Sequence, residues 1–509
     1  MNLYLDLDFK AAFAKDRFIF GVANAPYLCE GGYNTLEGPK NNFGYFEAEG
    51  SVPVSGETTR FWTDYRSHIQ LAARLGLTAF RTGVDWSRVQ PTRQLVEADA
   101  PEWDDAALER YADIISCVQE SAMEAIITLH HFTHPAWLGP TLWLRDDAVE
   151  QAVAYELRVV SELGDRLASR GQAPAGHFIT FNELNLLPLI DFGRLMGFAG
   201  GEEGPECFQQ AYDNVLSAHV RIYDGIKELY EERGWAEPRV GFGSNSDSTY
   251  EFDKLMLDVV RLREWGVARE DIASTLDERR DAWDVRIAGL GRRQLNDEQY
   301  EHYIAARKTK RKYVKPEGLR KTLDALYASS RPRKIDFISA NVYEPFGESR
   351  ALGGREAGPR MWEWAADGDI YRTMIHAYNE GNVDLPMYMG ENGFAYEQPR
   401  AGRAVPRPDG WSRERYLKTY LMEMVRCIAE GVPIKGYLYW SLVDDFEWDK
   451  GFSPRFGLYN YDYVSHEIGV RDGLGEPAGE IYSALITTLQ GGDKSRIREA
   501  FVNSYEPAK

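Results

Sequence analysis

Eight short runs of β-branched and aromatic residues recur along the chain, and long amphipathic stretches separate them. The runs cover residues 18–24, 78–83, 125–131, 177–183, 239–245, 334–341, 386–391 and 434–440. Each is nearly continuous in hydrophobic residues, which is typical of strands buried on both faces of a parallel sheet. Parallel neighbours need long crossovers, usually helices, so the alternation predicts βα units. Eight such units predict a closed (β/α)8 barrel, or TIM barrel, rather than an open sheet.

The stretches between the runs agree with a single barrel domain. Helical patterns occupy residues 59–75, 104–121, 145–170, 205–233, 317–329, 367–380 and 412–430. No GxGxxG motif follows the first run, which disfavours a dinucleotide-binding sheet. We therefore expect one (β/α)8 domain over residues 1–509, with inserted helices and long loops over the face where the strands end.

One segment is longer than a βα connection requires. Residues 246–333 are dense in charge, and we expect a helical insertion there, over the mouth or the side of the barrel. Its basic run RKTKRKYVK, at 307–315, could bind phosphate or nucleic acid. In an acidic chain, a solvated helix face is the better interpretation of that run.

The net charge and the spacing of the cysteines limit the kinds of ligand that we expect this chain to bind. The formal net charge is −20, which argues against nucleic acid or an anionic membrane and favours a neutral small molecule. Cys29, Cys117, Cys207 and Cys427 are widely separated and form no CxxC pair, so neither a zinc cluster nor a disulfide framework is indicated. The N-terminal segment has no apolar signal-peptide core and no long apolar stretch follows, so we expect a cytoplasmic protein without a membrane span.

The residues at the ends of the predicted strands are unusually polar. In a barrel of this type the active site lies at those ends. The candidates are Arg81, His131, Asn182, Glu183, Asn341, Tyr343, Glu391 and Trp440. Two carboxylates would thus face one mouth from nearly opposite strands, which suits acid and nucleophile work on an acetal. The sequence therefore predicts glycoside cleavage.

Such a reaction needs one neutral carboxyl and one ionised carboxylate. Arg81 beside Glu391 would keep that carboxylate ionised and its pKa low, while Glu183, with no cation nearby in sequence, could stay protonated. A structural ion pair is the alternative for either glutamate alone, but two at strand ends favour catalysis.

Two further motifs offer ligands for a substrate or a metal. HHFTH, with His130, His131 and His134, resembles a metal cluster, but adjacent strand residues point to opposite faces and no carboxylate or Cys sits at suitable spacing. His131 is better interpreted as a neutral partner for a hydroxyl. The loop WSLVDDFEW after the last run places Glu447 and Trp448 where an acid and an indole could hold a sugar.

Several motifs in order resemble glycoside hydrolase family 1, the retaining β-glucosidase and β-galactosidase family. FGVANAPYLCEG (20–31) is similar to FGxATAxYQxEG, and FRTGVDWSRVQP (80–91) to FRFSIxWSRIxP. TLHHFTHPAWL (128–138) resembles the family's HW or HF segment followed by LPxWL. TFNEL (180–184), GENGF (390–394) and WSLVDDFEW (440–448) resemble TFNEP, TENG and WSLLDNFEW. The resemblance extends over residues 18–463.

The resemblance implies a role for each candidate. Glu183 would be the acid/base and Glu391 the nucleophile of a double displacement that needs neither metal nor organic cofactor. The implied sugar contacts are Asn182 to the 2-hydroxyl, His131 to the 3-hydroxyl, Glu447 and Trp448 to the 4- and 6-hydroxyls, and Trp440 under the ring. The residues implied to orient and charge-tune the nucleophile are Arg81, Asn341 and Tyr343. The substrate would be a small glycoside, and a homo-oligomer is compatible with the sequence.

The chain departs from the family pattern at several positions. Cys29 stands where the family has a Gln that bonds the 3- and 4-hydroxyls, and a thiol cannot replace those bonds, so we expect an altered glycone preference. Leu184 replaces the Pro after the acid/base, and Gly390 replaces the Thr before the nucleophile. The insertion and the aromatic stretch 359–364 suggest a bulky, apolar leaving group.

Three other functions remain open on the sequence. A transglycosidase would pass the sugar to an alcohol acceptor, and a non-catalytic sugar-binding protein would keep the site without turnover. The pair Glu183 and Glu391 argues against the second, whereas Cys29 argues mildly for it. A phosphate-handling isomerase or aldolase would need a Gly-rich phosphate loop or a Lys at a strand end, and the sequence shows neither.

Overall fold

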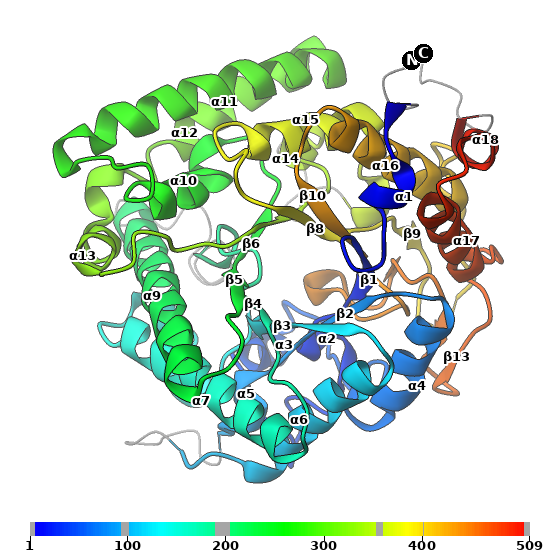
Figure 1. Ribbon diagram of the computed structural model, residues 1–509, viewed down its shortest axis with the longest axis horizontal. Coiled ribbons are helices and arrows are strands. Elements are labelled where there is room, and N and C mark those ends of the chain that lie inside the picture. The colour runs from blue at the N-terminus through cyan, green and yellow to red at the C-terminus, as the bar shows by residue number, and fades with distance from the viewer. Residues whose placement is uncertain (1–5, 93–100, 189–203, 353–359, 401, 503–509) are drawn as a thin grey trace.

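A ring of parallel strands enclosed by helices forms the centre of the molecule (Figure 1). The computed structural model describes residues 6–92, 101–188, 204–352, 360–400 and 402–502. Each of the eight predicted runs contains a strand. These are β1 (Ile19–Ala23), β2 (Ala79–Gly83), β3 (Glu124–His130), β4 (His177–Phe181), β5 (Arg239–Gly241) with β6 (Gly243–Asn245), β7 (Ile338–Asn341), β8 (Met387–Asn392) and β10 (Ile434–Tyr439).

The strands close on themselves. Their order is β5-β4-β3-β2-β1-β10-β8-β7-β6, and β1 pairs in parallel with β10. β5 and β6 are two halves of one run, interrupted only at Phe242. Because β5 pairs with β4 and β6 pairs with β7, this split strand joins the two edges of the sheet. The predicted eight-stranded TIM barrel is confirmed.

The helices of the outer ring match the seven predicted patterns. They are α4 (Phe61–Arg74), α6 (Asp105–Glu120), α7 (Ala148–Ser169), α9 (Gly204–Arg233), α13 (Arg320–Ala328), α15 (Gly368–Asn379) and α16 (Arg413–Ala429). Capping explains where several begin: the side chain of Asp104 accepts from Ala107 N ahead of α6, and that of Ser412 from Arg415 N ahead of α16. A further helix, α17 (Ala478–Gly491), packs against α1 (Phe9–Ala12) and α16.

The charged segment before β7 forms helices, as expected. They are α10 (Leu255–Arg261), α11 (Ile272–Gln294) and α12 (Asp297–Lys310). α11 is the long green helix along the outer edge in Figure 1, and it packs against α15 of the ring. α12 contacts the short α14 (Gly347–Arg350), which follows β7. The segment therefore covers the side of the barrel and also reaches the loops at the strand ends.

Short elements complete the loops. They are α2 (Pro26–Cys29), α3 (Phe43–Glu49), α5 (Trp86–Val89), α18 (Lys494–Ile497), β9 (Tyr396–Glu397), β11 (Pro454–Arg455), β12 (Tyr461–Asp462) and β13 (Glu467–Ile468). β11 pairs antiparallel with β9, and β12 with β13. Among the described residues, no helix combines the length and the apolar character needed to cross a membrane.

Candidate active site

The guanidinium of Arg81, in β2, hydrogen-bonds to groups at the ends of three other strands. It is fully buried. Its Nε donates to Thr128 Oγ1 in β3 (2.9 Å), and its Nη2 donates to Asn182 Oδ1, just after β4 (2.6 Å). Its Nη1 donates to the Gly390 carbonyl (2.9 Å) and to Glu391 Oε1 (2.8 Å) in β8. Because a guanidinium is planar and permanently charged, it fixes these groups in one arrangement.

Glu391 is held from two sides. Besides the Arg81 contact, its Oε2 accepts from the Tyr343 hydroxyl at 3.3 Å. Burial raises the pKa of Glu391, although Arg81 and Tyr343 act in the opposite direction. The expectation of a low pKa is therefore wrong in sign, because a side chain with so little exposed surface loses more solvation than one cation restores.

Glu183 occupies a turn directly after β4. Its φ is 42°, and its carbonyl accepts from the backbone N–H groups of Leu186 (2.7 Å) and Leu187 (3.0 Å). A left-handed non-glycine residue is strained, and such residues often lie at functional sites. Burial and the charge of Glu391 raise the pKa of Glu183 to about 8. Burial and the neighbouring charge thus favour the protonated form of Glu183, whereas the Arg81 cation favours the ionised form of Glu391.

Asn341 and Asn182 connect the two carboxyls. Asn341 Nδ2 donates to Glu183 Oε1 (3.0 Å) and to Asn182 Oδ1 (3.1 Å). The Asn341 side chain also lies close enough to Glu391 to lower the pKa of that carboxyl against the effect of burial. The structure thus brings the predicted pair into one buried network, at the ends of β4, β7 and β8.

His131 lies beside this network as a neutral ring. Burial, helped by Arg81 and His130, lowers the pKa of His131 well below its usual range. Its Nε2 faces Asn182 Nδ2 at 3.0 Å, so Nε2 accepts and Nδ1 carries the proton. Nδ1 has no acceptor among the described contacts, although it is buried. The ring can therefore donate one hydrogen bond to a hydroxyl.

The remaining rings of HHFTH lie in other surroundings. The His130 ring packs against the rings of Trp143 and Phe181, with centroids 5.6 and 5.4 Å apart. His134 Nε2 lies 2.9 Å from the Gly139 carbonyl. Among the residues that the structure describes, no group of three His, Cys, Asp or Glu side chains is arranged to hold a metal ion.

The loop after β10 forms an aromatic and acidic wall. Trp440 Nε1 donates to Glu447 Oε1 at 2.9 Å, and the Trp448 ring stacks near His131 with centroids 5.8 Å apart. Burial raises the pKa of Glu447 to about 8, against the hydrogen bond from Trp440. Asp445, which is not among the sequence candidates, is also buried, and burial and the charge of Glu447 raise its pKa. Sequence reasoning missed Asp445 because it precedes Phe446 in a loop, where periodicity gives no direction for a side chain.

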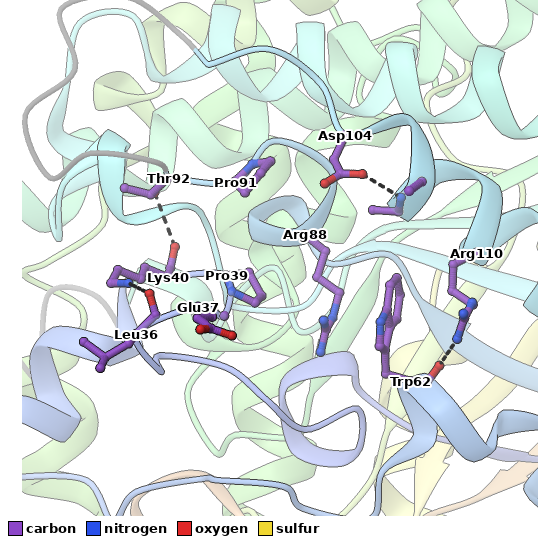
Figure 2. Close-up of a pocket in the computed structure, with 13 residues that line it drawn as sticks. Leu36, Glu37, Pro39, Lys40, Trp62, Arg88, Pro91, Thr92, Asp104 and Arg110 are labelled. Carbon is purple, nitrogen blue, oxygen red and sulfur yellow. Dashed lines mark hydrogen bonds between the residues drawn. The ribbon is translucent and has the colours of Figure 1, made fainter.

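Cys29 ends α2, which follows β1 and so neighbours the loop after β10. Its surface is 4% exposed, and burial, Glu30 and Asp445 raise the pKa of its thiol, so it is neutral. The next residue, Glu30, forms a buried ion pair with Arg88. On the outer side of that pair lies a pocket of about 580 Å³, in which Arg88 stacks on Trp62 (Figure 2). Neither Glu183 nor Glu391 lines that pocket.

The structure gives a physical reason for two departures from the family pattern, Gly390 and Leu184. A side-chain carbon on Gly390 would lie 2.1 Å from Ser339 Oγ and 2.8 Å from Asn341 Oδ1. The Thr found in the family would not fit beside these neighbours. Leu184 is buried, and its N–H donates to the Gly243 carbonyl at 2.8 Å, a bond that Pro could not make. Sequence reasoning missed Thr128, whose hydroxyl accepts a hydrogen bond from Arg81, because a hydroxyl within a buried strand gives no sign of its partner.

Comparisons with known proteins identify the family of the chain. The model of glycosyl hydrolase family 1 matches residues 9–268 and 290–486, which leaves out only part of α11 within that span. A β-galactosidase of Sulfolobus acidocaldarius is 24% identical and covers 89% of this chain and 91% of its own. β-Glucosidase 42 of Arabidopsis thaliana is 25% identical and covers 88% and 89%.

A solved structure agrees in fold. The β-glucosidase of Thermotoga maritima in complex with deoxynojirimycin superimposes with a TM-score of 0.66 at 20% identity, over 92% of this chain and 97% of that one. The family match covers far more than half of the sequence. The chain therefore belongs to glycosyl hydrolase family 1 and is a glycoside hydrolase.

Proposed function

We propose that the protein is a retaining β-glycosidase that removes a terminal β-linked sugar by double displacement. Glu183 acts as the acid/base and Glu391 as the nucleophile. The observation that carries this proposal is the different surroundings of two buried carboxyls in one network: Glu391 is paired with Arg81 at 2.8 Å, whereas Glu183 accepts from the Asn341 amide and its pKa is raised to about 8. A proton donor and an anion in one site are what acetal cleavage requires.

In the first step Glu183 protonates the glycosidic oxygen while Glu391 attacks the anomeric carbon. The C–O bond to the leaving group breaks, and a covalent glycosyl-enzyme forms. In the second step the ionised Glu183 takes a proton from water, which attacks the same carbon and releases Glu391. Arg81 and Tyr343 orient the departing carboxylate throughout.

The contacts of Asn341 support retention over inversion. Retaining enzymes keep the carboxyls about 5 Å apart, whereas inverting enzymes leave about 6.5–9.5 Å for a water molecule. Asn341 Nδ2 bonds Glu183 and the same side chain lowers the pKa of Glu391, and one amide that acts on both carboxyls is compatible with the shorter spacing.

The sugar would lie against Trp440, with the free Nδ1 of His131 and the carboxyl of Glu447 near its hydroxyls. We propose that Cys29 stands at the position of the family's Gln, and a thiol there would favour a glycone that differs from glucose or galactose in its 3- or 4-position bonding. We propose the whole chain as one domain that serves this site.

The test is turnover of a panel of aryl β-glycosides with different sugars, together with Glu391→Gly. We expect release from at least one glycoside, loss in the variant, and rescue by azide with an α-glycosyl azide as product. A β-configured azide would assign another nucleophile. Sugar binding without turnover by the folded wild-type protein would instead support a non-catalytic sugar-binding protein.

A further inference from the structure

A separate cavity, of about 580 Å³, opens at the end of the barrel opposite the carboxyl pair. Its wall contains the first residues of several strands, among them Ile19 of β1, Glu124 of β3 and Arg239 of β5. The strands run parallel, and Glu183 and Glu391 lie where β4 and β8 end, so this cavity is at the far end of the same barrel. Its volume is within the range of small-molecule sites, about 300–1,000 Å³. None of the candidate active-site residues lines it.

The charge of this wall is opposite in sign to that of the whole chain, whose formal net charge is −20. The ionisable side chains of the wall are the basic Lys15, Arg17, Arg239 and Lys435 and the acidic Asp16 and Glu124. Lys15, Arg17 and Lys435 are exposed, and none of them makes an ion pair with a residue that the structure describes. An excess of unpaired cations in an acidic protein attracts anions to this cavity.

The base of the cavity is a fixed network of side chains. Arg239 forms an ion pair with Glu124 and donates from Nη1 to the Tyr388 hydroxyl at 2.8 Å. Glu124 Oε1 also lies 3.1 Å from Nδ1 of the buried His177 ring. The rings of His177 and Tyr388 pack together, with centroids 5.0 Å apart. These contacts join the beginnings of β3, β4, β5 and β8 and hold the guanidinium and the phenol in one place.

Tyr388 offers a buried donor to this cavity. Its side chain lines the cavity although the residue is only 5% exposed. Its oxygen accepts from Arg239, and its own proton has no acceptor among the described residues. Burial raises the pKa of Tyr388 although Arg239 opposes this, so the phenol keeps its proton at neutral pH. A buried O–H group beside a guanidinium is a favourable partner for a phosphate oxygen, because both donate to the same anion.

The distribution of the basic side chains favours a ligand with more than one anionic group. They come from three separate parts of the chain: residues 15–17 before β1, Arg239 in β5 and Lys435 in β10. A ligand with two or more phosphate groups can contact several of these parts at once, whereas a single phosphate contacts fewer. The large apolar side chains of the wall are almost fully buried; they are Phe18, Ile19 and Leu77. Charge rather than apolar surface therefore selects the ligand.

We propose that this cavity binds a small polyanion that carries two or more phosphate groups, with the four basic side chains and the Tyr388 hydroxyl as its partners. The site is separate from glycoside cleavage and does not depend on the proposed function. A ligand that binds the folded protein alone stabilises it, so occupancy should also raise the midpoint of thermal unfolding.

The experiment is isothermal titration calorimetry of the full chain with sodium pyrophosphate at low ionic strength, repeated with orthophosphate. We expect one pyrophosphate per chain, bound at least tenfold more tightly than orthophosphate and more weakly as sodium chloride is added. The double variant Lys15→Met with Lys435→Met should weaken pyrophosphate binding about tenfold. Tyr388→Phe should also weaken it about tenfold, the effect of one hydrogen bond to a charged group. Circular dichroism of each variant without ligand checks that it is folded.

Lys308→Met is the matched control, because Lys308 is exposed on α12, within the basic run 307–315, and does not line the cavity. It should leave the affinity unchanged. Loss of affinity in Lys308→Met equal to that in the double variant would assign binding to general surface charge and overturn the proposal. No binding of pyrophosphate to the folded wild-type protein, or equal affinity in the wild type and the folded double variant, would overturn it as well.

Discussion

Residue by residue, the site separates two carboxyls of the same chemical type by their partners. Glu183 meets an amide and a neighbouring negative charge, whereas Glu391 meets a guanidinium and a phenol. Burial acts on both in the same direction, so the partners alone decide which carboxyl keeps the proton. The protonation states that the proposed mechanism requires are favoured by the contacts of Arg81, which bonds Glu391 and not Glu183.

The pKa of Glu183 predicts an alkaline limit to activity. The group must be protonated to donate, so kcat/KM for a substrate with a poor leaving group should fall as the pH rises through about 8. The check is a pH profile of the wild type and of Glu183→Gln. A 2,4-dinitrophenyl glycoside needs no proton, so the variant should hydrolyse it without the alkaline limb. Persistence of that limb in the variant would assign it to another group.

The second prediction for a single residue concerns Cys29 and the choice of sugar. In Cys29→Gln the amide would supply a donor and an acceptor where the thiol offers neither strongly, so we expect kcat/KM for aryl β-glucoside to rise about tenfold relative to the glycone that the wild type prefers. Cys29→Ser, which keeps the size but adds no reach, is the control. An unchanged ranking of glycones in Cys29→Gln would contradict a role for this position in sugar selection.

Among the elements, the split strand β5–β6 has the closest connection to the chemistry. β6 lies beside the turn that contains Glu183, and the two backbones are close together. A side-chain carbon on Gly243 would lie 2.9 Å from Glu183 N and 3.2 Å from Asn182 Oδ1. The glycine in this strand therefore permits the close approach of the two backbones.

Gly243→Ala should therefore displace Glu183, the proposed acid/base. We expect kcat to fall at least tenfold, with a loss of about 1–3 kcal/mol in unfolding free energy from the overpacking. Gly176→Ala is the control, because Gly176 precedes β4 at the opposite end and a carbon there would meet no atom within 4 Å. Aryl glycoside kinetics on both variants provide the measurement, and equal activity would show that the turn of Glu183 tolerates the shift.

The elements also show how far sequence reasoning extends. The strands were predictable because buried parallel strands are continuous in hydrophobic residues. The meeting of polar side chains at one end of the barrel was predictable because these residues come where the hydrophobic runs end. The run 239–245 gave no sign of its interruption at Phe242, since the break follows from pairing with two different neighbours. Asp445 and Thr128 could not be predicted, because their roles depend on contacts between loops and strands distant in sequence.

For the whole molecule, closure of the barrel brings the beginning and the end of the chain together. β1 pairs with β10, and α17 covers this junction while packing on α1. Tyr482 of α17 is buried, and its hydroxyl donates to the Gly21 carbonyl in β1 at 3.0 Å. This hydrogen bond thus connects α17 to β1 across 461 residues of sequence.

Tyr482→Phe should weaken this closure without creating a large void. The ring remains, but a buried carbonyl loses one donor, which costs about 1–3 kcal/mol when the group stays unsatisfied. We expect a lower midpoint of urea unfolding with an unchanged slope. Tyr45→Phe is the matched control: its hydroxyl also bonds a carbonyl, of Ala136 at 3.3 Å, but the side chain is half-buried and water can replace the bond. Equal midpoints for the two variants would show that the bond from α17 to β1 contributes no more to stability than a surface contact.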